Sequence, residues 1–291
     1  MIYTIKNDFL EIKVNDFGAE LWSIKGLKTN TEYLWQGEKP YWEDRATVIF
    51  PICGRLFEGK YTYKGKTYEM GIHGFAKKME YKVEEHTDDR ILLSFCSNDF
   101  TRAQYPFEFI FKMEYSLKDN VITQKFIVEN TDTKEIIFAV GGHPGFNAPF
   151  NKGEKYEDYY LEFATDEEKE NMCFTNHFFN GEYLPYKMQD GKIIPLTHKL
   201  FDSGLSLRKG AREVSLKSKV NNQSVTVKYQ DFERIGFWKD NFTTAPFICI
   251  EPWMSMPSRN GIVDDFETKL EMTHLPVGET YKASFTIQIK E

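Results

Sequence analysis

Residues 107–128 read FEFIFKMEYSLKDNVITQKFIV. From Phe107 to Leu117 every second residue is apolar, and the residues between them are mostly polar. This period of two is typical of a β-strand with one buried face and one solvated face. The turn signal Lys-Asp-Asn at 118–120 follows, and a second apolar alternation begins at Ile122. The stretch therefore predicts a β-hairpin.

The same alternation recurs along the chain, over 225–229 and 281–289, with Gly, Asn and Asp at short intervals between the runs. Helical periodicity is scarce. The best candidate is a short helix over 98–104, with Asn98 or Asp99 as its N-cap and Pro106 at its end. Many short strands with close turns predict an all-β sandwich or barrel. We find no low-complexity linker and no internal repeat, so we expect a single domain over residues 1–291.

The composition narrows the classes of partner. The net charge of −7 and the pI of about 5.6 argue against a nucleic-acid-binding protein, which would carry a basic patch. Aromatic residues make up 16% of the chain, which suits strands and also a sugar site, because a ring face can pack on the C–H side of a pyranose. No run approaches the roughly 18 apolar residues of a membrane span. We expect a small-molecule ligand, no nucleic acid and no membrane.

The four cysteines, Cys53, Cys96, Cys173 and Cys249, are far apart and form no CxxC pair, which argues against a disulfide framework and against a zinc site. Three of them, all but Cys173, have apolar neighbours, where a free thiol behaves as a small buried hydrophobe. The N-terminal residues lack the basic and apolar regions of a signal peptide. The sequence predicts a reduced, cytoplasmic protein, either a monomer or a homodimer.

Two histidines stand between glycines. His73 lies in Met-Gly-Ile-His-Gly-Phe-Ala at 70–76, and His143 lies in Val-Gly-Gly-His-Pro-Gly-Phe-Asn at 140–147. Glycine lets another group approach the backbone closely. Pro144 restricts His143, the residue before it, to extended geometry at what reads as the end of a strand over 136–140. Histidine transfers protons near neutral pH, but either one could instead fill a turn or satisfy buried carbonyls.

A carboxylate follows an apolar run at 246–250 and precedes Pro252 and Trp253. A carboxylate in apolar surroundings usually has a raised pKa, which suits a general acid or base, whereas a Glu just past a strand end would be solvated. Glu251 is therefore a candidate, and Trp253 could be a stacking platform for a sugar or simple packing. Arg55, after an apolar stretch and a glycine, can donate hydrogen bonds to ring hydroxyls. We assign Arg45 to a structural or surface ion pair.

The chain has no P-loop, no GxGxxG after a strand, no GxSxG and no HExxH. This removes the main sequence support for nucleotide cofactors, serine hydrolysis and zinc-protease chemistry. The remaining histidines, carboxylate and arginine suit proton transfer on a polyhydroxylated ligand. We expect no metal and no cofactor.

Three ordered motifs, at 72–76, 142–146 and 249–253, resemble those of the aldose 1-epimerase family, and its LacX-like branch above all. The stretches 34–37 and 45–56 are also similar to that branch, so that the resemblance spans essentially the whole chain. It implies a galactose mutarotase-like β-supersandwich and a cofactor-independent isomerase that interconverts the α and β anomers of a hexose.

The resemblance also implies roles for residues. Glu251 matches the general base that takes the proton of the C1 hydroxyl, and His143 matches the general acid that protonates the ring oxygen. His73 and Arg55 match residues that bind substrate hydroxyls. An aspartate of the family also contacts the sugar, and Asp202 is the best position for it here, although the sequence around it matches only loosely.

Three other functions compete with this one. A sugar-binding or sugar-sensing protein could keep the cleft without catalysis. A hexose-6-phosphate 1-epimerase should carry an arginine cluster for the phosphate, and only Arg45, Arg55 and Arg259 lie near the motifs, so a neutral sugar is favoured. A glycoside hydrolase would need two carboxylates at the scissile bond, and Glu251 alone is well framed.

Overall fold

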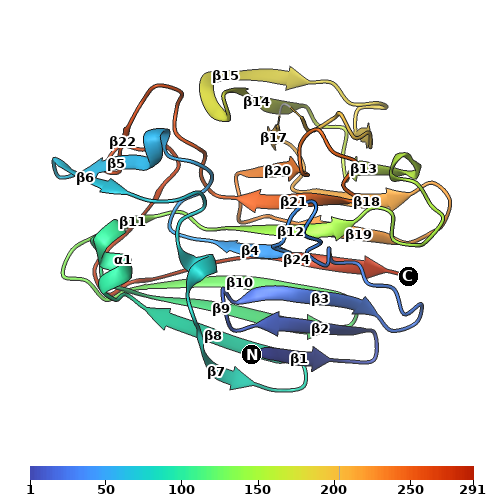
Figure 1. The fold of residues 1–291 in the computed structure, drawn as a ribbon, viewed down its shortest axis with the longest axis horizontal. Helices are drawn as coiled ribbons and strands as arrows, with labels where there is room; N and C mark the ends of the chain where they lie inside the picture. Colours follow the sequence, from blue (N-terminus) through green and yellow to red (C-terminus); the bar gives the residue numbers. More distant parts are fainter. Residues whose placement is uncertain (203) are drawn as a thin grey trace.

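The computed structural model describes residues 1–202 and 204–291, and its regular secondary structure is almost entirely β-strand (Figure 1). The single α-helix of this part of the chain is α1 (Asp99–Gln104), where the Asn98 side chain accepts from the N–H of Thr101, as the capping pattern predicts. Short 3₁₀-helices occupy Phe57–Gly59, Ala76–Lys78 and Tyr156–Asp158. None of the described helices has the length and apolar character that crossing a membrane requires.

The largest sheet has nine antiparallel strands. Its strands are, in spatial order, β16 (Ile193–Pro195), β13 (Tyr159–Phe163), β18 (Glu213–Ser218), β19 (Ser224–Lys228), β24 (Thr280–Lys290), β10 (Val121–Asn130), β9 (Phe109–Lys118), β8 (Arg90–Cys96) and β7 (Lys82–His86). The predicted hairpin is the pair β9–β10, in which Lys118 lies opposite Val121. The runs at 225–229 and 281–289 correspond to β19 and β24, so the all-β prediction is confirmed.

A second antiparallel sheet has seven strands. Its spatial order is β15 (Phe178–Tyr186), β14 (Lys169–Thr175), β17 (Leu205–Arg208), β20 (Arg234–Trp238), β21 (Phe247–Trp253), β12 (Gly141–Asn147) and β4 (Ala46–Ile49). Figure 1 shows β12 and β21 near the middle of the molecule, between β4 and β20. Both strands carry one of the motifs singled out above, so the two motifs are neighbours in space.

Three small sheets complete the fold. They are β1 (Ile2–Lys6), β2 (Leu10–Asn15) and β3 (Glu20–Gly26); β5 (Lys60–Tyr63), β6 (Lys66–Glu69) and β22 (Asp264–Asp265); and β11 (Ile136–Phe138) with β23 (Thr273–Leu275). The first covers one end of the core, where the Tyr115 hydroxyl of β9 donates to the Ala19 carbonyl just before β3. All pairings within these sheets are antiparallel except that of β22 with β5.

The two large sheets pack on each other through the apolar faces of their strands. A Cβ added to Gly142 of β12 would lie 2.6 Å from the Phe285 ring of β24, so the glycine is required by the close approach of the sheets. Ile248 and Ile250 of β21 are fully buried on the same side as Gly142, in the main core. Because side chains alternate across a strand, His143 and Glu251 point to the opposite face, away from the nine-stranded sheet.

Glu251 is buried inside β21, in apolar surroundings rather than solvated past a strand end. The prediction around the two glycines needs correction. The strand expected over 136–140 is β11, which ends at Phe138, and the glycines at 141 and 142 begin β12 rather than ending a strand. The glycines belong in the strand because neighbouring groups occupy the space of a side chain: a Cβ on Gly141 would lie 2.8 Å from the Pro252 carbonyl oxygen.

All four cysteines are free, but only Cys53 and Cys249 are buried. Cys96 is exposed, contrary to the expectation from its apolar neighbours. It is the last residue of β8, where Phe95 points into the core and the alternation turns the next side chain outward. Arg45 has the structural role expected, although through stacking on Trp22 at 3.9 Å and through hydrogen bonds rather than an ion pair.

Candidate active site

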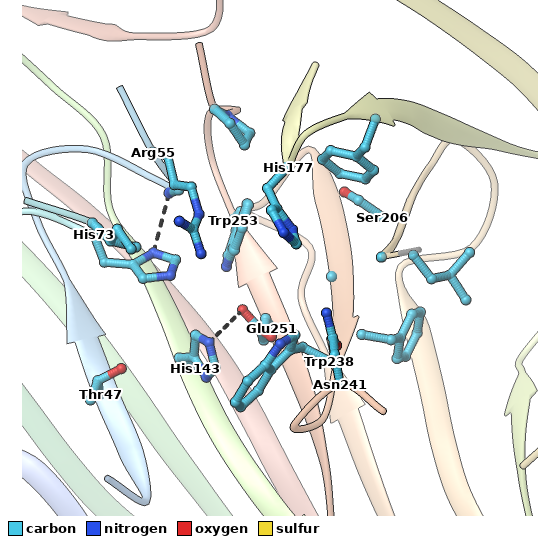
Figure 2. Close-up of a pocket in the computed structure, with 18 of the residues that line it drawn as sticks. Thr47, Arg55, His73, His143, His177, Ser206, Trp238, Asn241, Glu251 and Trp253 are labelled. Carbon is cyan, nitrogen blue, oxygen red and sulfur yellow. Dashed lines mark hydrogen bonds and ion pairs between the residues drawn. The ribbon is translucent and has the colours of Figure 1, made fainter. Parts of the chain in front are cut away.

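A cavity of about 340 Å³ opens on the face of the seven-stranded sheet that points away from the nine-stranded sheet (Figure 2). Its floor is a row of residues at one level of the sheet, one from each of five neighbouring strands. The row consists of Thr47 (β4), His143 (β12), Glu251 (β21), Gly236 (β20) and Ser206 (β17).

Strand register explains how His143 and Glu251 meet although they lie far apart in the sequence. Gly141 pairs with Trp253, and Gly145 pairs with Cys249. In an antiparallel pair these two matches place the residue midway in one strand, His143, opposite the residue midway in the other, Glu251. His143 Nε2 lies 3.1 Å from Glu251 Oε2.

Both members of this pair are buried, Glu251 with 2% of its surface exposed and His143 with 8%. Burial disfavours the charged form of each group. It raises the pKa of Glu251 to about 8, and burial together with the positive charge of Lys77 lowers the pKa of His143 to about 3. Near neutral pH both shifts favour the neutral forms, a protonated carboxyl group on Glu251 and an uncharged imidazole on His143.

Aromatic rings account for the low polarity around His143. The imidazole centroid lies 5.0 Å from that of Trp42, 5.6 Å from that of Trp238 and 5.3 Å from that of His73. All three rings also line the cavity, and their apolar surfaces reduce the access of water to the imidazole. The sequence predicted neither tryptophan as part of the site, because Trp42 and Trp238 are distant in the chain and lie in no recognisable motif.

His73 lies in the glycine-rich turn predicted for 70–76, with a positive φ of 62°. The turn is tight because the next residue, Gly74, passes the end of β4: a Cβ there would lie 2.2 Å from the Phe50 carbonyl oxygen. The backbone N–H of Gly54 donates to His73 Nδ1 at 3.2 Å, so the neutral ring carries its proton on Nε2. Burial, with His143 nearby, lowers the pKa of His73 well below its ordinary value, so this ring is a neutral hydrogen-bond donor.

Arg55 and Trp253 also line the cavity, as predicted. Figure 2 shows both beside His73 and above His143. The Arg55 guanidinium makes no ion pair or hydrogen bond with the described residues, and its donors remain available to a ligand. The Trp253 ring is set edge-on to His73, with centroids 5.3 Å apart.

Asp202 does not line the cavity. Its carboxylate accepts a hydrogen bond from the backbone N–H of Phe242 at 3.0 Å. Phe242 follows Asn241, whose side chain does line the cavity. The prediction that Asp202 binds the sugar is therefore not supported, because the aspartate holds a loop of the site and does not line the cavity.

Several lining residues were not predicted from the sequence. Those with polar or aromatic side chains include Thr47, Lys77, Ser206, His177, Asn241 and the two tryptophans named above. Ser206 and Asn241 come from ordinary strand and loop sequences that carry no motif. His177 lies in the two-residue turn between β14 and β15, where Asn176 and His177 both have positive φ. Asparagine at the first position of such a turn favours a hairpin, and it is the local feature of the sequence that indicates this turn.

One group of side chains has ligand types that a divalent metal accepts. His143, Cys249 and Glu251 each offer an atom within 4.8 Å of the others. Burial raises the pKa of the Cys249 thiol well above its ordinary value, so a metal would have to displace a firmly held proton. The surroundings favour proton transfer between His143 and Glu251 over metal binding.

Comparison with known proteins identifies the family of the chain. The aldose 1-epimerase family model matches residues 1–288. The chain is 30% identical to the chromosomal protein LacX of Lactococcus lactis subsp. lactis over 302 residues, which cover 99% of each chain. Among solved structures, it is similar to a galactose mutarotase related enzyme from Lactobacillus acidophilus, with 34% identity, a TM-score of 0.96 and coverage of 100% of this chain and 98% of that one.

A second solved structure, a galactose mutarotase-like protein from Lactobacillus casei ATCC 334, has 29% identity, a TM-score of 0.94 and full coverage of both chains. These similarities extend over the whole sequence and include the strands that carry the site. The resemblance inferred from the three motifs is thereby confirmed, and so is the galactose mutarotase-like fold. The chain belongs to the aldose 1-epimerase family.

Proposed function

We propose that this protein is a mutarotase, an isomerase that interconverts the α and β anomers of a neutral aldohexose. The observation that carries the proposal is the contact of 3.1 Å between His143 Nε2 and Glu251 Oε2 at the floor of a cavity. A buried acid–base pair that holds one proton suits a reaction in which one proton leaves the sugar as another is delivered to it.

The reaction begins with the proton of the pair on Glu251. Transfer of this proton to His143 across the 3.1 Å contact gives the carboxylate and the imidazolium that the reaction uses. Glu251 then takes the proton of the C1 hydroxyl while His143 protonates the ring oxygen, and the bond between C1 and the ring oxygen breaks. The aldehyde rotates about C1–C2. Ring closure reverses both transfers and restores the pair.

The lining residues near the pair suit a polyhydroxylated ligand. Arg55 and the Nε2–H of His73 supply donors for hydroxyl oxygens, and Trp253 supplies an apolar ring. A phosphate would call for a cluster of arginines. Neither Arg45 nor Arg259 lines the cavity; Arg259 lies over the Phe179 ring at 5.8 Å. A neutral sugar therefore remains the preferred substrate.

Polarimetry tests the proposal directly. Freshly dissolved α-glucose or α-galactose should approach its equilibrium rotation faster with the protein than without it. A spontaneous rate that is unchanged across several aldoses and their 6-phosphates would contradict catalysis. Sugar binding without acceleration, detected by tryptophan fluorescence, would instead support a binding or sensing protein, and acceleration of the 6-phosphates alone would identify a hexose-6-phosphate epimerase.

The pH dependence of kcat/KM provides a second test. Between the pKa of about 3 for His143 and that of about 8 for Glu251, the free pair holds one proton and both reaction roles can be filled. We expect kcat/KM, corrected for spontaneous mutarotation, to be level from about pH 5 to 7 and to fall above about pH 8, because the pair then loses its last proton. A decline that is already half complete near pH 6.5 would indicate an ordinary, solvated histidine instead.

A further inference from the structure

The side of the cavity that faces Arg55 and His73 carries three polar side chains that the proposed acid–base step does not use. Figure 2 shows them as Ser206, His177 and Asn241, on the far side of Glu251 from His73. We refer to these three residues as the far wall. They come from β17, from the turn between β14 and β15 and from the loop between β20 and β21.

Strand register sets the distance between the far wall and the acid–base pair. Glu251 pairs with Gly236, and Gly236 pairs with Ser206, so that Ser206 lies two strands away on the same face of the sheet. Neighbouring strands are about 4.8 Å apart, which puts the Ser206 backbone roughly 10 Å from that of Glu251. A sugar ring placed with C1 and its ring oxygen at the pair can therefore extend toward Ser206.

The strand between them leaves room for the ring. Gly236 has no side chain, and the three atoms nearest to a Cβ built there would all belong to Glu251, at 3.5 to 3.8 Å. The position is thus free of backbone conflict, and the glycine is not needed for a tight turn or for packing. Because Gly236 has no side chain, the cavity is deeper between the acid–base pair and the far wall.

Two atoms of the far wall lack a partner. Ser206 Oγ and Asn241 Oδ1 are both buried, and neither makes a hydrogen bond within the part of the chain that the structure describes. Ser206 is only 3% exposed. Buried polar atoms are normally satisfied, and unsatisfied ones call for an explanation. Both atoms line the cavity, and a sugar hydroxyl can donate to the amide oxygen and exchange a hydrogen bond with the serine.

The loop that carries Asn241 is held by bonds that do not involve a ligand. The buried Lys239 ammonium donates to the carbonyls of Asp240 and Thr243 at 3.0 and 2.9 Å. Asp202 accepts from the N–H of Phe242 at 3.0 Å. These contacts fix the loop on both sides of Asn241, so its side chain is positioned before any ligand binds.

We propose that the far wall binds the hydroxyls at C2 and C3 of the sugar and selects among hexoses by their configuration at these carbons. The far wall lies beyond Glu251 on the line of the floor row that starts at His143. When the ring oxygen is at His143 and C1 is at Glu251, C2 is therefore the ring carbon nearest the far wall, and C3 follows it. The inference rests on the proposed mutarotase function and adds the part of the substrate that is recognised.

The test combines protein variants with deoxy sugars. Ser206→Ala, Asn241→Ala and His177→Ala are each expected to raise KM for glucose or galactose roughly 2- to 10-fold, the value of one neutral hydrogen bond, and to change kcat by less than 2-fold. The increase should disappear for 2-deoxyglucose or 3-deoxyglucose, whichever lacks the hydroxyl that the deleted side chain contacts. At least one variant should also change the ratio of kcat/KM for glucose and mannose, which differ at C2.

Two further variants serve as comparisons. Thr175→Ala alters an exposed residue of the same hairpin and is expected to leave every KM unchanged. Asp202→Ala should reproduce the sugar dependence of Asn241→Ala with a smaller rise in KM, because Asp202 is a positioning residue that acts through the loop; a general loss of structure would lower kcat for all sugars alike.

The inference is overturned if the three far-wall variants raise KM equally for glucose, 2-deoxyglucose and 3-deoxyglucose, or if they leave KM unchanged while the wild-type protein is active. If the wild-type protein accelerates no aldose, the proposed function fails instead. Dissociation constants for the same sugars, from tryptophan fluorescence, then decide whether the far wall binds the C2 and C3 hydroxyls in a protein without catalysis.

Discussion

The Glu251→Gln variant is expected to lower kcat/KM for aldose mutarotation by ~10²–10⁴-fold, the usual contribution of one positioned acid or base. Glutamine has nearly the shape of glutamate and can occupy the same place opposite His143, but it cannot take the C1 proton. The effect should be large because Glu251 is the only carboxylate in the floor row of the cavity, where it contacts the imidazole at 3.1 Å.

Polarimetry on α-glucose, with circular dichroism to verify the fold, measures this effect. The matched control is Glu213→Gln, the same chemical change in an ion pair with Lys228 on the outside of the nine-stranded sheet, which should retain full activity. His143→Asn should also be strongly impaired. Retention of more than a tenth of the wild-type kcat/KM by Glu251→Gln would refute the role of Glu251 as the base.

The second large effect concerns stability. Glu251 has an ordinary pKa of 4.5 and, by burial, one of about 8 in the folded protein. Between these values the folded state binds a proton that the unfolded state does not, so its contribution to stability is full below pH 4.5 and is lost as pH rises through about 8. The difference between these two pKa values corresponds to at most about 5 kcal/mol in the free energy of unfolding. The free energy of unfolding of Glu251→Gln relative to wild type should therefore increase by up to this amount from pH 4.5 to 8.

The pKa shift of His143 changes stability with pH in the opposite direction. Its pKa is lowered by burial from 6.5 to about 3, so its contribution is present above pH 6.5 and is lost as pH falls toward 3. The two contributions offset each other between pH 4.5 and 6.5. For the wild-type protein we therefore expect the contribution of this site to the free energy of unfolding to decrease as pH rises above 6.5, and also to decrease as pH falls below 4.5.

Urea unfolding followed by tryptophan fluorescence, at a series of pH values, measures both contributions. Ser206→Ala is a useful control, because it lines the same cavity without a titratable group and should shift stability equally at every pH. If wild type and Glu251→Gln showed parallel stability curves from pH 4.5 to 8, burial of the Glu251 carboxyl group would not raise its pKa. If the two curves diverge as expected, burial of the Glu251 carboxyl group lowers the free energy of unfolding as pH rises above 4.5, a loss of stability of the kind that active sites often carry.

Local sequence patterns predicted the secondary structure well where one face of a strand is buried. The alternation over 107–117 and the turn that follows correspond to β9 and β10, because a period of two can bury only one side of an extended chain. Prediction was poorer at the motifs themselves. Glycine and proline usually end strands, yet Gly141, Gly142 and Pro144 lie inside β12. There the close packing of neighbouring backbone and of Phe285 outweighs the local preference.

The sequence by itself determined the fold class and the family. Of the six site residues that it predicted, five line the cavity. Strand alternation and short motifs are local properties of the chain, which is why they can be recognised without the structure. The tertiary structure decided which side chains share the cavity. Strand register brings Glu251 opposite His143 and sets Gly236 and Ser206 beside them. It also decided their protonation, since the pKa of a buried group depends on the rings and strands that exclude water from it, and these come from distant parts of the chain.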